Sequence, residues 1–297
     1  MSERFNQLLD REIIWELLDP NAVVYLTLVL IIFYVGKKAY DLLTPYDLNH
    51  ELLEADNKAV AVSLSGYLFG LGIILWGVLG DSPEKLMASK SEFYMDLMDT
   101  AVWGGIGIVL LQIARIINDK LILNRFDNIK EIVNDRNIGT GAVQCGAFIG
   151  SALMIRASLI GGDENYLTSI GFALIFFVLG QLGFFVYTKF YQFVTSYDIH
   201  EEIEKDNVAS GVAFGMSLIA VGVLISGYMV KHDSILGLGI WFIIGTFLLL
   251  IVRLLVDKII LPGRLLDNEI KQDQNWGAAI IEGSAAIIFA FVLNTAF

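Results

Sequence analysis

Ionisable and amide side chains inside long apolar segments are the residues of this sequence best placed to do chemistry. Glu282 lies well inside the last apolar segment, and Gln144 occupies the matching position of an earlier one. Such groups are costly in hydrocarbon and often mark ion or proton pathways. We therefore take Glu282 and Gln144 as a candidate path for a small cation or a proton. The alternative for Glu282 is a neutral or arginine-paired hydrogen-bonding role.

A second set of polar residues recurs four times with constant spacing. Each copy has a Glu, five intervening residues and an Asn, and small residues follow two, four and eight positions after the Asn. The motif residues are Glu51, Asn57, Glu131, Asn137, Glu201, Asn207, Glu269 and Asn275. An Asn at the start of a helix is a favoured N-cap. The alternatives are a ring of carboxylates and amides that attracts cations, or a docking face for a soluble partner.

Each motif leads into an apolar segment, and a further apolar segment precedes it. Hydrophobic residues make up 56% of the 297 positions and charged residues 18%, with a mean hydropathy of +0.64. About 20 apolar residues suffice to cross a bilayer as a helix. The expected spans are 22–42, 59–79, 99–121, 138–160, 166–190, 208–230, 235–257 and 276–296. The sequence predicts an all-α polytopic membrane protein with eight transmembrane helices built from four parallel two-helix repeats.

The repeats are themselves paired, which indicates two duplications. The first and third copies share one set of residues, and the second and fourth share another, so we expect halves at 20–162 and 163–297. Residues 1–19 are expected to form an amphipathic segment on the bilayer surface. Repeats that enter the membrane in the same direction are related by an axis along its normal. We therefore expect the four motifs to surround a pseudo-twofold or pseudo-fourfold axis.

Small residues four positions after each Asn predict close helix packing. These residues are Ala61, Gly141, Gly211 and Ala279. Small side chains let helix backbones approach where lipid supplies no hydrophobic drive. We expect all four to be buried at contacts between the motif-bearing helices.

Other chemistry finds little support in this sequence. Arg115 and Asp119, like Arg253 and Asp257, stand four residues apart, which favours structural ion pairs on one helix face. The sequence has no phosphate-binding loop, dinucleotide fingerprint or hydrolase motif. We predict no enzyme activity, no catalytic residues, no metal site and no cofactor. The net charge of −12 argues against nucleic acid as a partner.

The distribution of basic residues predicts an orientation. The four motif-bearing loops and adjoining helix ends carry 14 of the 20 Lys and Arg residues. Loops rich in Lys and Arg stay in the cytoplasm. We therefore expect the motifs to be cytoplasmic and both termini to lie outside.

The motif resembles that of a known family, the bacterial inner-membrane proteins called domain of unknown function 350. The resemblance is carried by Asp56, Asn57, Ala59, Ala61 and Gly66, and again by Asp206, Asn207, Ala209 and Gly211. It covers the chain beyond residue 20 and implies a fused double unit in a bacterial inner membrane, with no assigned activity.

Two functions follow as hypotheses from the motifs and the buried polar residues. The first is a channel or carrier for small cations or protons, with the lipid bilayer and the cation as partners. The alternative is a non-transporting membrane scaffold or complex subunit that binds a soluble cytoplasmic or membrane protein.

Overall fold

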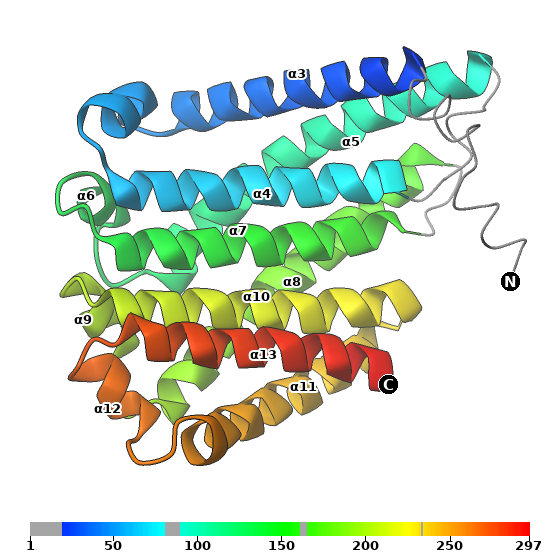
Figure 1. Ribbon diagram of the computed structural model, residues 1–297. Coiled ribbons are helices and arrows are strands. Elements are labelled where there is room, and N and C mark those ends of the chain that lie inside the picture. The colour runs from blue at the N-terminus through cyan, green and yellow to red at the C-terminus, as the bar shows by residue number, and fades with distance from the viewer. Residues whose placement is uncertain (1–19, 81–89, 161–164, 233) are drawn as a thin grey trace, which may run out of the picture.

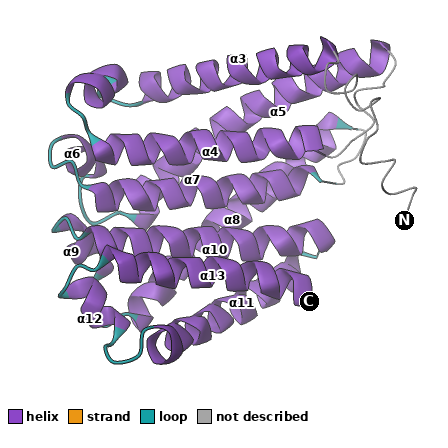
Figure 2. Ribbon diagram, viewed as in Figure 1, coloured by secondary structure: helices purple, strands orange, loops and turns teal. Residues whose placement is uncertain are grey.

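The computed structural model describes residues 20–80, 90–160, 165–232 and 234–297, and this part of the chain is helical without strands (Figure 2). Within these residues, eight helices are long and apolar enough to cross a membrane. They are α3 (Pro20–Leu43), α4 (Lys58–Gly80), α5 (Lys90–Ile117), α7 (Ile138–Leu159), α8 (Tyr166–Val194), α10 (Val208–Lys231), α11 (Ile235–Leu255) and α13 (Trp276–Ala296). The eight expected spans are confirmed, and the third starts earlier than expected. The predicted amphipathic segment 1–19 lies outside the described residues.

Short helices connect the spans where the motifs lie. They are η1 (His50–Glu54), η3 (Asn118–Ile122), α6 (Asn128–Val133), α9 (Ile199–Glu204), η4 (Val256–Ile260) and α12 (Leu266–Lys271). The π-helical segments η3 and η4 continue α5 and α11 directly. All these short helices gather at one end of the molecule, which we call the motif face (Figure 1).

The transmembrane helices form two layers. In the inner layer, α4 packs on α7, α7 on α10, and α10 on α13, so the four motif-bearing helices stand in a row (Figure 1). In the outer layer, α5 covers the groove between α4 and α7, α8 that between α7 and α10, and α11 that between α10 and α13. The helix α3 packs on α4 and α5 at the start of the row.

The expected pseudo-symmetry axis is wrong. A twofold axis along the membrane normal through the middle of the row would exchange α4 with α13. The duplication instead matches α4 with α10 and α7 with α13, which a shift along the row achieves. The repeats therefore stack like those of a solenoid, each contacting its neighbours. Repeats that enter the membrane in the same direction can be related by a translation along the row as readily as by a rotation about the membrane normal.

Close backbone contacts hold the row together. A Cβ added at Gly211 would lie 2.3 Å from the Cα of Gly139, and one at Gly146 would lie 2.0 Å from the carbonyl oxygen of Gly215. No side chain fits in such gaps, so the sequence needs glycine there. Glycine in a helix costs about 1 kcal/mol relative to alanine in water, and here the packing of the next helix offsets that cost.

The predicted burial of the small residues is confirmed for three of the four. Gly141, Gly211 and Ala279 are buried against the preceding inner helix. Ala61 is only half-buried, so the prediction is wrong at this position. The reason is its place in the row, since α4 comes first and no inner helix precedes it.

Candidate functional site

The first three motif asparagines each join three parts of the structure, as Asn137 illustrates. Its side-chain oxygen accepts from the backbone N–H of Thr140 at 3.0 Å and caps α7. Its side-chain nitrogen donates to Glu131 Oε2 at 2.9 Å and to the carbonyl oxygen of Ile203 at 2.5 Å. Ile203 belongs to the next repeat. The amide therefore caps its own helix, fixes the motif Glu and binds the following repeat.

The same junction recurs along the row. The Asn57 amide donates to Glu51 and to the carbonyl of Ile132, and the Asn207 amide donates to the carbonyl of Ile270. Asn275, in the last repeat, caps α13 and donates to Glu269. The expected helix starts at the four asparagines are confirmed, on one face of the molecule (Figure 1).

The third repeat departs from the predicted motif by one residue. Asn207 donates to Glu202 at 3.1 Å, whereas Glu201 forms a surface ion pair with Lys205. The backbone N–H of Asn207 likewise bonds to Glu202, where the other three asparagines bond to the Glu six positions earlier. The turn between α9 and α10 is thus one residue tighter, and Glu202 takes the place predicted for Glu201.

The motif carboxylates accept hydrogen bonds from the asparagine amides at these junctions. Glu51, Glu131 and Glu202 are buried, and burial raises the pKa of Glu131 above its ordinary value. A carboxylate that accepts from an amide inside a contact is poorly placed to attract ions to a mouth. This geometry favours helix capping and inter-repeat bonding over a cation-attracting ring.

Glu282 lies in a buried ionic cluster of the second half. Its Oε1 is 3.3 Å from Nε of Arg253, which also pairs with Asp267. The Arg253 guanidinium lies over the ring of Tyr191, 5.2 Å from its centroid. The cluster joins α8, α11, α12 and α13. The arginine-paired role of Glu282, the alternative considered from the sequence, is the one the structure has.

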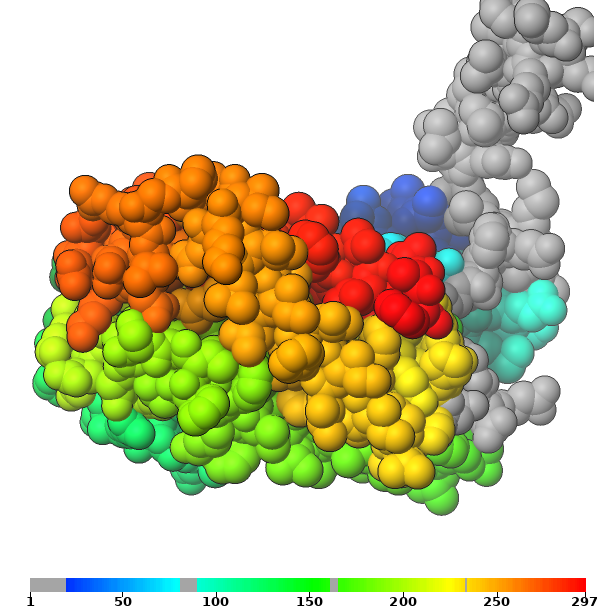
Figure 3. Space-filling model, turned by 90° about the horizontal axis from the view of Figure 1, so that it is seen from below, coloured from blue at the N-terminus to red at the C-terminus, as the bar shows by residue number. Residues whose placement is uncertain are grey.

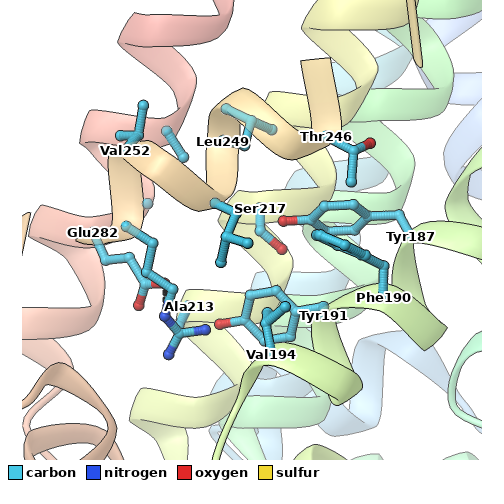
Figure 4. A pocket seen from close by; sticks show the side chains of 14 residues that line it. Tyr187, Phe190, Tyr191, Val194, Ala213, Ser217, Thr246, Leu249, Val252 and Glu282 are labelled. Carbon is cyan, nitrogen blue, oxygen red and sulfur yellow. Dashed lines mark ion pairs between the residues drawn. The ribbon is translucent and has the colours of Figure 1, made fainter. Parts of the chain in front are cut away.

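The cavity beside this cluster is small. Glu282 lies on one side, and the rings of Tyr187 and Tyr191 from α8 lie across from it (Figure 4). Its volume is about 20 Å³, which is room for about one water molecule. Glu282 Oε2 and the Tyr191 hydroxyl are buried without a protein hydrogen-bond partner there. A hydrated ion does not fit in this space.

Gln144 belongs to a different cluster, in the first half. Its Nε2 donates to Asp119 Oδ1 at 2.9 Å, and its Oε1 accepts from Ser63 at 2.6 Å. The Ser63 hydroxyl is in turn 3.0 Å from that of Tyr40. A chain of hydrogen bonds thus connects α3, α4, α7 and η3.

Asp119 and Gln144 line a larger pocket, of about 250 Å³, near the motif face. Among the described residues, no basic side chain lies within 4 Å of the Asp119 carboxylate. Arg115 instead donates to the carbonyl of Leu43 and lies over the ring of Tyr40. Asp119 thus has an amide partner and no arginine at ion-pair distance, although Arg115 and Lys120 line the same pocket.

Neither predicted Arg–Asp pair forms. Arg253 bonds to Asp267 and Glu282, and Asp257 accepts from the backbone N–H of Leu266. Both predicted pairs straddle the boundary between an α-helix and a π-helical segment. The wider π turn rotates the following residues away from the face that i,i+4 spacing gives in an α-helix.

Glu282 and Gln144 do not meet. They stand on α13 and α7, which are separated by α10, and they line separate cavities. The sequence did not predict Asp119 and Ser63 as partners of Gln144, or Tyr40 as the partner of Ser63. The repeated Lys-x-Tyr at Tyr40 and Tyr191 was the available signal, since both tyrosines lie at these clusters.

The chain matches the family Domain of Unknown Function (DUF350) twice, over residues 12–159 and 165–297. It belongs to this family. The two matches show a fused double unit, as the repeats predict. No solved structure matches it.

Two relatives are described as transmembrane proteins. A UPF0719 transmembrane protein of Aquifex aeolicus (strain VF5) is 22% identical over 251 residues, covering 82% of this chain and 88% of the relative. The UPF0719 transmembrane protein YshE of Bacillus subtilis (strain 168) is 25% identical over 130 residues, covering 44% of this chain and 93% of the relative. The protein is a multi-pass membrane protein, and one relative matches about half of it along nearly its whole length.

Proposed function

We propose that the protein is a non-transporting membrane scaffold, a structural subunit of a larger membrane assembly. The observation that carries the proposal is the inner row, where helices meet at backbone distance through Gly139, Gly146, Gly211 and Gly215. Asn57, Asn137 and Asn207 bond each repeat to the next at the motif face. Protein packed this tightly has little compressibility and moves as a unit.

The geometry of Glu282 argues against a cation path through the second half. Its charge is paired with Arg253, and its cavity holds about one water molecule. A carrier needs a group that exchanges its ion or proton with solvent. Glu282 instead anchors the guanidinium that joins α12 to α13.

Reconstitution into liposomes tests this proposal. Liposomes with the purified protein should show no flux of protons, sodium or potassium beyond that of empty liposomes. Glu282→Gln should lower the melting temperature in detergent, because Arg253 loses its buried carboxylate partner, and should leave the ion leak unchanged. A protein-dependent flux that Glu282→Gln alters would overturn the scaffold proposal.

One observation favours a second candidate function, the binding of a small cation in the first half. Asp119 faces a pocket of about 250 Å³ together with Gln144 and forms no ion pair within 4 Å among the described residues, although Arg115 and Lys120 line the same pocket. Carboxylate and amide oxygens suit hard cations. Sodium or potassium should then raise the melting temperature of the parent protein and of Glu282→Gln, but not of Asp119→Asn. Equal salt responses in all three proteins would exclude this site.

A bacterial inner membrane is the proposed location, with the motif face in the cytoplasm. The support is the excess of Lys and Arg in the motif loops. The partner proposed from the sequence, a soluble cytoplasmic or membrane protein, would then meet the scaffold on this face or at the ends of its row.

A further inference from the structure

The inner row ends in two unmatched helix faces. One is the α13 outer face, formed by Gly277, Ile280, Ile281, Ser284 and Ile288, which lie 2, 5, 6, 9 and 13 positions after Asn275. The other is the α4 open face, formed by Ala61, Ser65, Leu68 and Gly72, which lie 4, 8, 11 and 15 positions after Asn57. Figure 3 looks onto the end of the molecule that carries α11 and α13.

Inside the row, these two sets of positions always face each other. Gly66 meets Cys145, Gly146 meets Gly215, and Met216 meets Gly283. In each pair, the ninth residue after one Asn contacts the eighth residue after the next. The pattern holds at all three inner contacts, so the register of the row is fixed by the repeat.

The same register predicts which residue would contact each uncovered end of the row. Ser284 is the ninth residue after Asn275, and Ser65 is the eighth after Asn57. Ser65 is exposed, although it carries a small side chain like those at the equivalent contact positions, where Cys145 is half-buried and Gly215 and Gly283 are buried. The first repeat thus retains a packing surface that no described inner helix of its own chain covers, and α3 approaches it only near Gly72, through Phe33.

Hydrogen bonding at the motif face independently indicates that the last repeat lacks a following repeat. Asn57, Asn137 and Asn207 each donate to a carbonyl of the next repeat, that of the residue after the Glu to which the next motif Asn is bonded. These acceptors are Ile132, Ile203 and Ile270. Within the described residues, Asn275 bonds only to Glu269 and its own helix. The corresponding acceptor on a first repeat is the carbonyl of Leu52.

The outer layer is incomplete at the same end. Each of α5, α8 and α11 packs on two neighbouring inner helices, whereas α3 packs on one inner helix, α4, and on the outer helix α5. Several side chains of α3 are exposed as a result, including Leu30 at 61% and Tyr34 at 63%. An inner helix placed before α4 would give α3 the groove that the other outer helices have.

We propose that the α13 outer face of one molecule packs on the α4 open face of a second copy of the same chain. The contact continues the row in the register of its inner contacts, with Ser284 opposite Ser65 and the Asn275 amide donating to the Leu52 carbonyl. It is a heterologous interface, which generates a ring or an extended row. The partner is thus a second copy, and only the purpose of the assembly rests on the proposed scaffold function.

The half-length relative supports this assembly. The Bacillus subtilis protein aligns with 44% of this chain over 93% of its own length. A chain of that size contains two repeats and one inner contact of the kind described here. In a protein of two repeats, the contact that α7 and α10 make within this chain is available only between two chains.

Cysteine cross-linking in membranes tests the contact. Two differently tagged chains, both carrying Cys145→Ser, are expressed together, one with Ser65→Cys and the other with Ser284→Cys. Cβ atoms in the predicted register are close enough for a disulfide. Oxidation should give a covalent dimer that contains both tags, and neither single variant should form a dimer by itself.

Matched controls separate a specific contact from collision. Val186 of α8 is 45% exposed and lies eight residues before the end of its helix near the motif face, so Val186→Cys has a comparable depth. Paired with Ser284→Cys, it should give little product. Adding Ala61→Leu to the Ser65→Cys chain should lower the yield roughly tenfold through overpacking, equivalent to about 1.4 kcal/mol.

The proposal fails if the yield of the mixed dimer equals that of the Val186→Cys control while both thiols react with a membrane-permeant maleimide. It also fails if either single variant dimerises efficiently, since that indicates an isologous contact. Ion flux in liposomes with normal cross-linking would overturn the scaffold function but leave the assembly standing. If the liposomes show no ion flux and no cross-linked dimer forms, the assembly is overturned and the scaffold function stands.

Discussion

At the scale of single residues, the motif asparagines show why this position needs an amide. A Ser or Asp could cap the helix, because both offer an oxygen to the first N–H groups. Neither could also donate two hydrogen bonds, as the Asn57, Asn137 and Asn207 side chains do to a carboxylate and a carbonyl. The chemistry of the motif is therefore structural. It fixes the register of neighbouring repeats.

Asn137→Asp tests that role. The variant keeps the cap but loses both donors, and it places a carboxylate beside buried Glu131. We expect it to cost about 3 kcal/mol of stability, measured as a large fall in melting temperature in detergent. Asn275→Asp is the matched control, since Asn275 is exposed and makes only one of the two bonds. A similar fall in both variants would contradict the inter-repeat role of the amide.

His200 should make stability sensitive to acid. It is buried, with Nε2 at 2.7 Å from the carbonyl oxygen of Ile122, and burial lowers its pKa below 6.5. A base with a lowered pKa in the folded state contributes its full stability above its unfolded pKa, and that stability is lost as the pH falls. The melting temperature of the parent protein should therefore drop between about pH 7 and pH 5.

The equivalent histidine of the first repeat provides the control. His50 is exposed beside Glu54. His200→Gln should flatten the pH dependence of melting, whereas His50→Gln should keep the slope of the parent protein. Equal slopes in the parent protein and His200→Gln would show that another group causes the loss in acid.

Residue patterns predicted some of this site and missed the rest for identifiable reasons. The cap at Asn137 was readable, because capping depends on a local sequence and a helix start. The pairing of Asp119 with Gln144 was not, because the π-helical segment η3 changes the rotation of Asp119. The use of Glu202 in place of Glu201 depends on a turn one residue tighter, which the constant Glu–Asn spacing conceals.

At the scale of elements, the inner helices carry two different small-residue faces. One, at four and eight positions after the Asn, meets the preceding helix; the other, at two and nine positions, meets the following one and includes Met216 in the third repeat. The sequence showed that the residues at two, four and eight positions are small, and hence that helices pack closely. It did not show which neighbour each face meets, because that depends on contacts between segments far apart in the chain.

Leucine substitutions should distinguish small residues buried between two inner helices from those on the uncovered face of α4. Gly211→Leu places a side chain where a Cβ alone would lie 2.3 Å from Gly139, so we expect a loss of at least about 3 kcal/mol or a failure to fold. Ala61→Leu adds the same bulk on the α4 open face and should leave the melting of the isolated chain within about 0.5 kcal/mol of the parent protein. Equal damage by both substitutions would mean that α4 is covered within its own chain.

At the scale of the whole molecule, duplication produced a row instead of a ring within one chain. Parallel repeats can be related by translation or by rotation, and hydropathy is the same for both. The choice is made by packing: each inner helix uses opposite faces for its two neighbours, which places successive helices along a line. A line leaves two ends, so one face of α4 and one face of α13 lack an inner-helix neighbour among the described residues.

The orientation of this row in the membrane is the last prediction. The motif loops and helix ends hold 14 of the 20 basic residues, and such loops remain in the cytoplasm. Asn134, at the motif face, and His232, at the opposite end of the spans, are both exposed. In a Cys145→Ser background, a membrane-impermeant maleimide added to spheroplasts should label His232→Cys but not Asn134→Cys, and lysis should make both reactive. Labelling of Asn134→Cys before lysis would show the opposite orientation, with the motif face outside the cell. The scaffold would then offer its asparagine junctions to partners outside the cell, and the proposed cation pocket at Asp119 would open to the exterior.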